Sequence, residues 1–210
     1  MCRFFLKLAS YITEPAKMSK DLELVNKVKS GNTAMFYDLV NIYQKQVVNT
    51  CYSFVNHKED AEDVAQEVFV EVYRSINKFR EESSFSTWLY RLSVNKSLDF
   101  IRARNRQKRG SGLLSFWSGG ELERLNVVSL DQPGEVLESE ERRTILLAAI
   151  NKLPERQKVA ITLSKLEELS QEEVAEVMQT SVSSVESLLV RAKKRLRILL
   201  YGFFSEKYER

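Results

Sequence analysis

The stretch Ser170–Leu200 constrains the fold most, because it reads as two helices joined by a tight turn. Its sequence is SQEEVAEVMQTSVSSVESLLVRAKKRLRILL, and the second helix becomes densely basic towards its end. Ser170 and Glu173 have the spacing of a capping box at the start of the first helix. A tight turn followed by a basic helix is typical of a helix-turn-helix, which places a rigid helix in a DNA groove. We therefore predict a DNA-binding domain here.

The rest of the chain predicts an all-α fold with two small helical domains joined by a flexible linker, the C-terminal one a helix-turn-helix. The 210 residues exceed what one core of modal size needs. Glycine and proline are few, at 7 and 3, and good helix formers are plentiful. Five of the 7 glycines fall in Gly110–Gly134, which has the composition of a linker. We divide the chain into an N-terminal extension of unclear status (1–17), a first domain (18–109), the linker (110–137) and a second domain (138–204).

The helix expected over Asp60–Asn77 has two distinct faces. Apolar residues at three- and four-residue spacing predict a buried stripe: Ala61, Val64, Ala65, Val68, Phe69, Val72 and Ile76. Acidic and amide side chains lie largely on the opposite face: Asp60, Glu62, Asp63, Gln66, Glu67 and Glu71. An acidic face suits docking on a basic protein surface, although a run of charges is more often a solvated face.

The next expected helix carries the second basic run of the chain. Ser86 or Thr87 is expected to cap this helix, which runs to about Arg106. Its tail, Arg102–Arg109 (RARNRQKR), is too basic to face a core and is expected to contact phosphates. Arg102 also stands three residues from Asp99, which fits an ion pair within the helix.

Several classes of function are disfavoured by the sequence. Cys2 and Cys51 have neither a metal-ligand spacing nor a disulfide pattern, which is typical of a cytoplasmic protein. The single His57 is expected to be an exposed turn residue. A phosphate-binding glycine loop and a nucleophile–base arrangement are both missing from the sequence. We therefore expect no catalytic activity, metal, cofactor or small-molecule substrate. The apolar run in residues 1–17 is interrupted by Lys7 and is too short to span a membrane.

Three blocks, in this order, make the chain resemble a bacterial RNA polymerase sigma factor of the extracytoplasmic-function group. DAEDVAQEVFVEVYRSINKF (Asp60–Phe79) resembles the segment that binds the core polymerase. SSFSTWLYRLSVNKSLDFIRARNR (Ser83–Arg106) resembles the segment that melts and reads the minus-ten element. LPERQKVAITLSKLEELSQEEVAEVMQTSVSSVESLLVRAKKRLR (Leu153–Arg197) resembles the domain that reads the minus-thirty-five element. The resemblance covers about Met18–Leu200.

The resemblance implies that the first domain binds both polymerase and the minus-ten element. Asp63, Gln66 and Glu67 match positions that contact the clamp helices of the largest polymerase subunit, and Asp60 lies on the same acidic face. The implied minus-ten set is Lys78, Phe79, Arg80, Ser84, Phe85, Ser86, Trp88, Arg91, Asn95, Lys96 and Arg102. Within it, the loop Lys78–Ser86 captures a base, Asn95 helps to read the strand, and Arg91 and Lys96 hold phosphates. For Trp88 a core position is the favoured interpretation, because an aromatic residue at helical spacing is more often buried.

The second domain is implied to read the minus-thirty-five element and to meet the flap of the second-largest polymerase subunit. Its last helix, capped by Ser183 or Ser181, offers a DNA-facing set: Ser181, Ser183, Ser184, Glu186, Ser187, Val190, Arg191, Lys194 and Arg195. The sequence departs from the family here, with VESLL where V-K-S-R-L is usual and Gln179 where the turn glycine is usual. If Gln179 is left-handed, it costs about 1 kcal/mol relative to glycine.

The sequence leaves open two other functions, a one-component regulator and a nucleic-acid enzyme. It also leaves open what the cluster Leu113–Trp117 contacts and whether an anti-sigma partner exists. A one-component regulator would use only the helix-turn-helix, but it would carry a ligand pocket or receiver domain in place of an acidic docking helix. An enzyme that acts on nucleic acid would need a metal cluster or catalytic pair. The apolar cluster Leu113–Trp117 either docks on a partner or packs locally. The family is often held inactive by an anti-sigma partner, which the sequence does not identify.

Overall fold

The computed structural model describes residues 21–110 and 135–208. The N-terminal extension, most of the predicted linker and the Leu113–Trp117 cluster lie outside these residues. Every regular element of the described ranges is a helix, which confirms the all-α prediction. These described residues divide into two compact units, residues 21–52 with 57–96 and residues 53–56 with 97–110 and 135–208. We describe each of them by itself.

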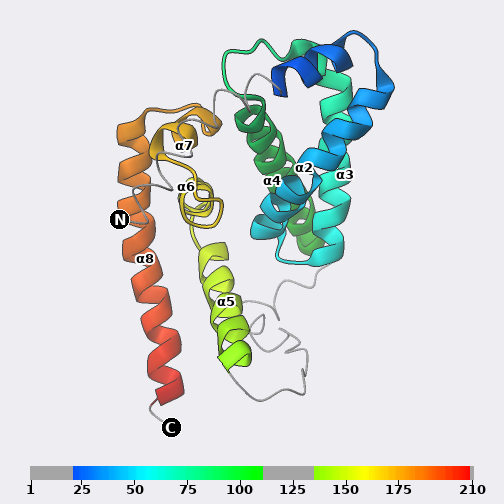
Figure 1. Ribbon diagram of the computed structural model, residues 1–210. Coiled ribbons are helices and arrows are strands. Elements are labelled where there is room, and N and C mark those ends of the chain that lie inside the picture. The colour runs from blue at the N-terminus through cyan, green and yellow to red at the C-terminus, as the bar shows by residue number, and fades with distance from the viewer. Residues whose placement is uncertain (1–20, 111–134, 209–210) are drawn as a thin grey trace. The chain divides into compact units, whose positions relative to one another are not determined.

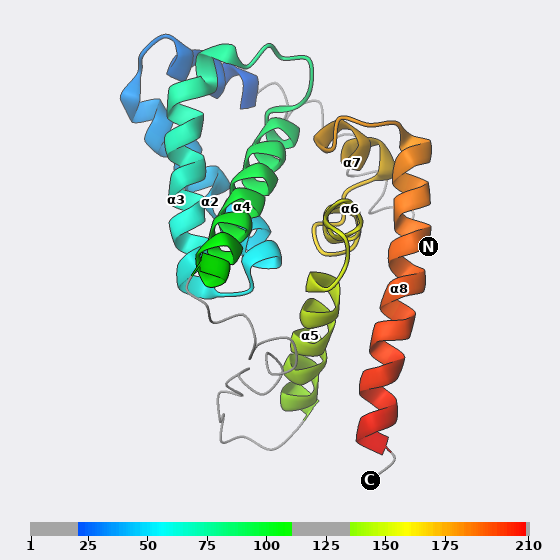
Figure 2. The ribbon, with the colours of Figure 1, turned by 180° about the vertical axis from the view of Figure 1, so that it is seen from behind.

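The first unit is built from a helix over residues 21–29, α2 (Thr33–Val55), α3 (Lys58–Ser75), the 3-10 helix η1 (Ile76–Lys78) and the start of α4 (Phe85–Gly110). Helices α2, α3 and α4 run side by side in both views (Figures 1 and 2). Their apolar faces meet in a core in which Leu39, Val68 and Leu89 are fully buried. Burial of such side chains contributes about 1.5–3 kcal/mol each.

Helix α3 follows the predicted pattern closely. Six members of the expected stripe are buried: Ala61, Val64, Ala65, Val68, Val72 and Ile76. Phe69 is the exception, because it is only half-buried at the margin of that stripe. The helix starts at Lys58, where the exposed His57 acts as the N-cap and its side chain accepts from the backbone N–H of Asp60. His57 is thus an exposed helix-start residue, as expected.

The second unit contains α5 (Glu135–Asn151), α6 (Glu155–Lys165), α7 (Gln171–Val177) and α8 (Val182–Tyr208). Helix α8 (orange to red in Figure 1) is the long helix against which α5, α6 and α7 pack. Its apolar face buries Val185, Leu188, Leu189, Ala192 and Leu196. Helix α5 begins at Glu135, so its first turn occupies the last residues of the predicted linker.

Candidate functional site

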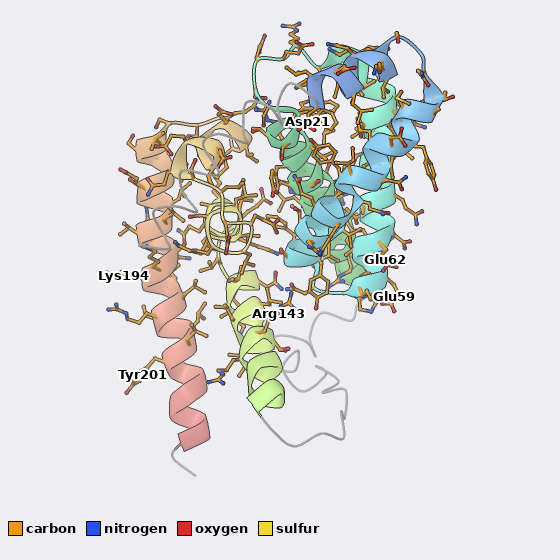
Figure 3. The ribbon with its side chains drawn as sticks, viewed as in Figure 1. Asp21, Glu59, Glu62, Arg143, Lys194 and Tyr201 are labelled. Atoms are coloured by element: carbon orange, nitrogen blue, oxygen red, sulfur yellow. The ribbon has the colours of Figure 1, made fainter. Side chains whose placement is uncertain are left out.

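The exposed face of α3 carries the acidic residues that the sequence singled out. Asp63, Gln66 and Glu67 are all exposed, and Asp60 is half-buried. Figure 3 shows the neighbouring acids Glu59 and Glu62 pointing outward from the same helix. Asp63, Gln66 and Glu67 border a surface hollow of about 520 Å³, which we call the α3 hollow; its other lining residues are Val70, Glu71, Arg74 and Lys96. Apart from Lys96, which lies on α4, the hollow is formed by one helix face.

Lys96 of α4 lines the α3 hollow and pairs with an acidic residue of α3. Its Nζ is 3.4 Å from Oε2 of Glu71, and the two side chains are 30% and 35% exposed. A half-exposed pair of this kind is worth about 0.2–1 kcal/mol. The structure therefore brings one residue of the predicted minus-ten set onto the predicted polymerase-binding face.

Two members of the predicted minus-ten set, Phe79 and Phe85, are buried in an aromatic cluster. Phe79 is 4% exposed and Phe85 is 2% exposed. Their ring centroids lie 5.7 Å apart, and Trp88 lies 5.4 Å from Phe79 and 5.6 Å from Phe85. Tyr43 of α2 closes the cluster at 5.2 Å from Phe85. Edge-on and tilted ring packing at these distances is stabilising, so the cluster anchors both ends of the loop that joins η1 to α4.

This η1–α4 loop comprises residues 79–84 and leads into α4 through a side-chain cap. The prediction that Ser86 or Thr87 caps α4 is wrong. Ser84 is the cap, because its Oγ accepts from the backbone N–H of Thr87 at 3.0 Å. The hydroxyl of Ser86 instead accepts from Nε2 of Gln46 on α2 at 3.1 Å, and Thr87 is 5% exposed. The cap therefore lies two or three residues earlier than expected, and α4 starts at the buried Phe85.

The other predicted minus-ten residues are distributed around the loop and along α4. Lys78, Arg80 and Asn95 are exposed, whereas Ser84, Ser86, Trp88 and Arg91 are half-buried. Arg102 is exposed and lies farther along α4, where its Nη1 donates to Oδ1 of Asp99 at 3.0 Å. This contact matches the ion pair within the helix that the spacing of the two residues allowed as an alternative. Lys78 and Arg80 are the exposed cations at the loop itself.

Helices α7 and α8 form the predicted helix-turn-helix pair. The capping box at Ser170 is confirmed: its Oγ accepts from the N–H of Glu173 at 3.2 Å, and its own N–H donates to Oε2 of Glu173 at 2.8 Å. Gln179 in the turn has φ 49°, the left-handed conformation that favours glycine. Ser181 caps α8, since its Oγ accepts from the N–H of Ser184 at 3.3 Å.

The predicted minus-thirty-five residues fall on the outer face of α8 and its cap. Seven of them are exposed along α8, opposite the buried Val185 and Leu189: Ser183, Glu186, Ser187, Val190, Arg191, Lys194 and Arg195. Ser181 is exposed and Ser184 is half-buried. Figure 3 shows Lys194 pointing away from α5 and α6. Val190 is 67% exposed, so this face combines hydroxyls, an acid, an apolar group and cations.

The described residues also bear on metal binding and on membrane insertion. In residues 21–110 and 135–208, no group of three or more His, Cys, Asp or Glu side chains is arranged to hold a metal ion. None of the described helices is long and apolar enough to cross a membrane.

Sequence reasoning missed Lys29, a residue that contacts the η1–α4 loop. Lys29 ends the helix over residues 21–29, and its Nζ donates to the backbone oxygen of Phe79 at 2.8 Å. The two residues are fifty positions apart, and a local pattern carries no signal of such a contact. Gln46, which binds Ser86 across forty positions, was missed for the same reason.

Two family models match the chain, and together they cover more than half of it. The model described as Sigma-70 region 2 matches residues 39–107. The model described as Sigma-70, region 4 matches residues 143–196. The first range contains α3, the η1–α4 loop and most of α4, and the second contains α6, α7 and the exposed face of α8.

Whole-length relatives agree with these matches. The chain is 36% identical over 181 residues to the "ECF RNA polymerase sigma-E factor" of Haemophilus influenzae, covering 86% of this chain and 95% of that protein. The Escherichia coli K12 protein of the same name is also 36% identical, covering 84% and 92%. The "RNA polymerase sigma-H factor" of Pseudomonas aeruginosa is 33% identical with the same coverage, 84% and 92%.

Two solved structures have a similar fold. One is CnrH in complex with the cytosolic domain of CnrY, with a TM-score of 0.62 and 25% identity over 87% of this chain and 97% of that one. Another is the sigma factor RpoE of Bartonella quintana in complex with the anti-sigma factor NepR. It has a TM-score of 0.57 and 22% identity over 79% of this chain and 96% of that one, which supports the fold alone.

Proposed function

The chain belongs to the extracytoplasmic-function group of the sigma-70 family of bacterial RNA polymerase sigma factors, and from that premise we propose which of its surfaces bind polymerase and which bind DNA. It is a transcription initiation factor that binds core RNA polymerase and directs it to promoters. The observation that supports this assignment is the separation of charge: exposed acids such as Asp63 and Glu67 on α3, and the cations Arg191, Lys194 and Arg195 on the outer face of α8.

The acidic face of α3 is the proposed polymerase-binding surface. Asp60, Asp63, Gln66 and Glu67 would meet the clamp helices of the largest subunit. A rigid helix with one buried stripe and one charged face suits docking on a basic coiled coil, since complementary charge accelerates association and fixes register. The flap of the second-largest subunit would contact the second domain, taken as residues 138–204.

The η1–α4 loop and the start of α4 are the proposed minus-ten surface within a first domain of residues 18–109. Lys78 at the end of η1, Arg80 in the loop and Asn95 farther along α4 are exposed, and they would hold phosphates and read an unpaired base. Phe79 and Phe85 would act by anchoring the loop, because their rings are buried. Trp88 would support the same cluster from its half-buried position.

The outer face of α8 is the proposed minus-thirty-five surface. Its first turns carry Ser183, Glu186 and Ser187, which would face base edges in the major groove. Arg191, Lys194 and Arg195 follow and would bind phosphates. Because both domains bind one DNA molecule, their individually modest affinities reinforce each other.

A one-component regulator is the competing function. Such a protein would need only α6, α7 and α8, and it would have no use for an acidic docking helix. The match to region 2 over residues 39–107 favours the initiation factor instead. We propose further that the chain has no catalytic activity of its own and that it acts in the cytoplasm with RNA polymerase. An anti-sigma partner remains a proposal that the family alone supports.

Run-off transcription tests this function directly. Core RNA polymerase is supplied with a library of promoter fragments, with and without the purified chain. We expect new start sites that require the chain and share elements near minus ten and minus thirty-five. If the chain creates no start site beyond those of core polymerase alone, the initiation function is excluded and the regulator takes its place.

A further inference from the structure

The ammonium group of Lys29 makes three contacts with the η1–α4 loop (residues 79–84). It donates to the backbone oxygen of Phe79 at 2.8 Å. It lies 3.3 Å from Oε1 of Glu81. It also lies 5.3 Å from the centroid of the Phe79 ring, within range of a cation–π interaction. The Lys29 side chain is only 21% exposed, so this lysine is turned towards the loop rather than towards solvent.

The loop needs such a contact because its backbone is locally disfavoured. Glu81 has φ 62°, a left-handed conformation that residues with a side chain rarely adopt. Conformations of this kind persist only where several contacts from the surrounding structure hold them in place. Lys29 contacts Phe79, which lies two positions before Glu81, and it contacts Glu81 itself. It therefore adds a contact at Glu81, which lies between Phe79, packed on Phe85, and the Ser84 cap.

The side chains that this loop presents belong to the proposed minus-ten surface. Arg80, Glu81 and Glu82 are exposed at its tip, between the buried rings of Phe79 and Phe85. A single strand is read by side chains and backbone groups held at fixed positions, and a loop that is free to move must be ordered again at each binding event. Its geometry thus bears directly on recognition.

We propose that Lys29 is a positioning residue for minus-ten recognition: it holds the η1–α4 loop in its reading conformation without touching DNA. The proposal rests on the proposed minus-ten function of that loop. It assigns a role in promoter reading to the helix over residues 21–29, which precedes the range matched by the region 2 model.

Lys29→Met tests the proposal, with Lys27→Met as the matched control. Lys27 lies on the same helix and is half-exposed, and its Nζ contacts only the neighbouring Glu23 among the described ion pairs, at 2.7 Å. Both variants lose one positive charge. The probe is a fluorescent single strand that carries the minus-ten sequence of a promoter recovered in the run-off library. A second probe has its most strongly selected base replaced.

Binding is measured on assembled holoenzyme, so that only folded, polymerase-bound protein contributes. For Lys29→Met we expect the affinity for the cognate strand to fall by about three- to tenfold. The ratio between cognate and substituted strands should fall as well, because a mobile loop discriminates less. Affinities for core polymerase and for minus-thirty-five duplex should stay within twofold of wild type. Lys27→Met should leave every quantity within twofold, and Lys29→Arg, which keeps a cation, should restore much of the ratio.

A double variant separates loop position from charge. If Lys29 served only to neutralise Glu81, Lys29→Met/Glu81→Gln would bind the cognate strand like wild type, and the proposal would be overturned. An unchanged ratio in Lys29→Met would also overturn it. Should Lys29→Met bind core polymerase more weakly by the same factor as the strand, the residue would be merely structural. Failure to recover any promoter would refute the proposed function itself, and it is visible before a variant is made.

Discussion

The ammonium of Lys96 on α4 lies 3.4 Å from the Glu71 carboxylate on α3. Lys96 is expected to hold a minus-ten phosphate, and Glu71 lines the α3 hollow that is proposed to bind polymerase. The pair therefore links the two proposed surfaces of the first unit. Because a lysine side chain cannot hold a carboxylate and a phosphate equally well at once, we expect the Glu71 contact to compete with DNA for Lys96.

Glu71→Gln is expected to strengthen binding of a minus-ten single strand. Loss of a half-exposed pair worth about 0.2–1 kcal/mol corresponds to a gain of about 1.4- to 5-fold in affinity. Fluorescence anisotropy with a labelled strand measures this gain. Glu23→Gln is the control, since it breaks the exposed pair with Lys27, which holds the pKa of the Glu23 carboxyl below its ordinary value. A gain that persists in a Lys96→Ala background would contradict this account.

Gln179→Gly is expected to stabilise the helix-turn-helix. The φ of 49° at Gln179 disfavours any residue with a side chain by about 1 kcal/mol relative to glycine. Hydrogen exchange of amides in α7 and α8 should slow by about fivefold, which is the equivalent of that free energy. Glu172→Gly, placed in α7, should act in the opposite direction, because glycine weakens a helix. Equal or faster exchange in Gln179→Gly would show that the turn does not carry this strain.

Lys194→Ala is expected to weaken binding of α8 to all duplex sequences alike. A phosphate contact contributes through release of counterions, so the slope of log affinity against log salt should fall by about 1 in magnitude. Titrations of minus-thirty-five duplex at several salt concentrations provide the slope. Arg143→Ala removes a cation from α5 and should leave the slope unchanged. A loss confined to one DNA sequence would instead indicate that Lys194 reads bases.

The sequence predicted the helices well, because their apolar spacing and local caps are encoded within a few residues. The stripe of α3 and the capping box of Ser170 and Glu173 are such signals. The cap of α4 was predicted wrongly since Ser84, Ser86 and Thr87 are chemically similar candidates. The contacts that distinguish them join distant segments: Phe85 packs against Tyr43 and Phe79, and Ser86 accepts a hydrogen bond from Gln46.

The candidate surfaces were predictable in part. The exposed face of α8 follows from helix periodicity, which places Glu186, Val190 and Lys194 in one row. Contacts between distant segments were not predictable, because they depend on how the helices pack. Lys29 reaches Phe79 and Lys96 reaches Glu71 only after the first unit has folded. A sequence shows that these side chains are charged, but not what they face.

The most direct test of the account is the affinity of the chain for core RNA polymerase after the charges of two acids in the α3 hollow are reversed. Asp63→Lys with Glu67→Lys turns two exposed acids of the hollow into cations. The control is Glu23→Lys with Asp38→Lys, which makes the same change of charge at two exposed residues outside α3 and its hollow. Circular dichroism and thermal melting establish that each variant is folded.

We predict that the Asp63→Lys/Glu67→Lys variant loses at least about tenfold in affinity for core polymerase, because like charges then face each other across the interface. The Glu23→Lys/Asp38→Lys control should lose less than about threefold, since these residues lie outside the acidic face of α3. Equal binding of wild type and the Asp63→Lys/Glu67→Lys variant, with both folded, would contradict the assignment of α3 as the polymerase-binding surface.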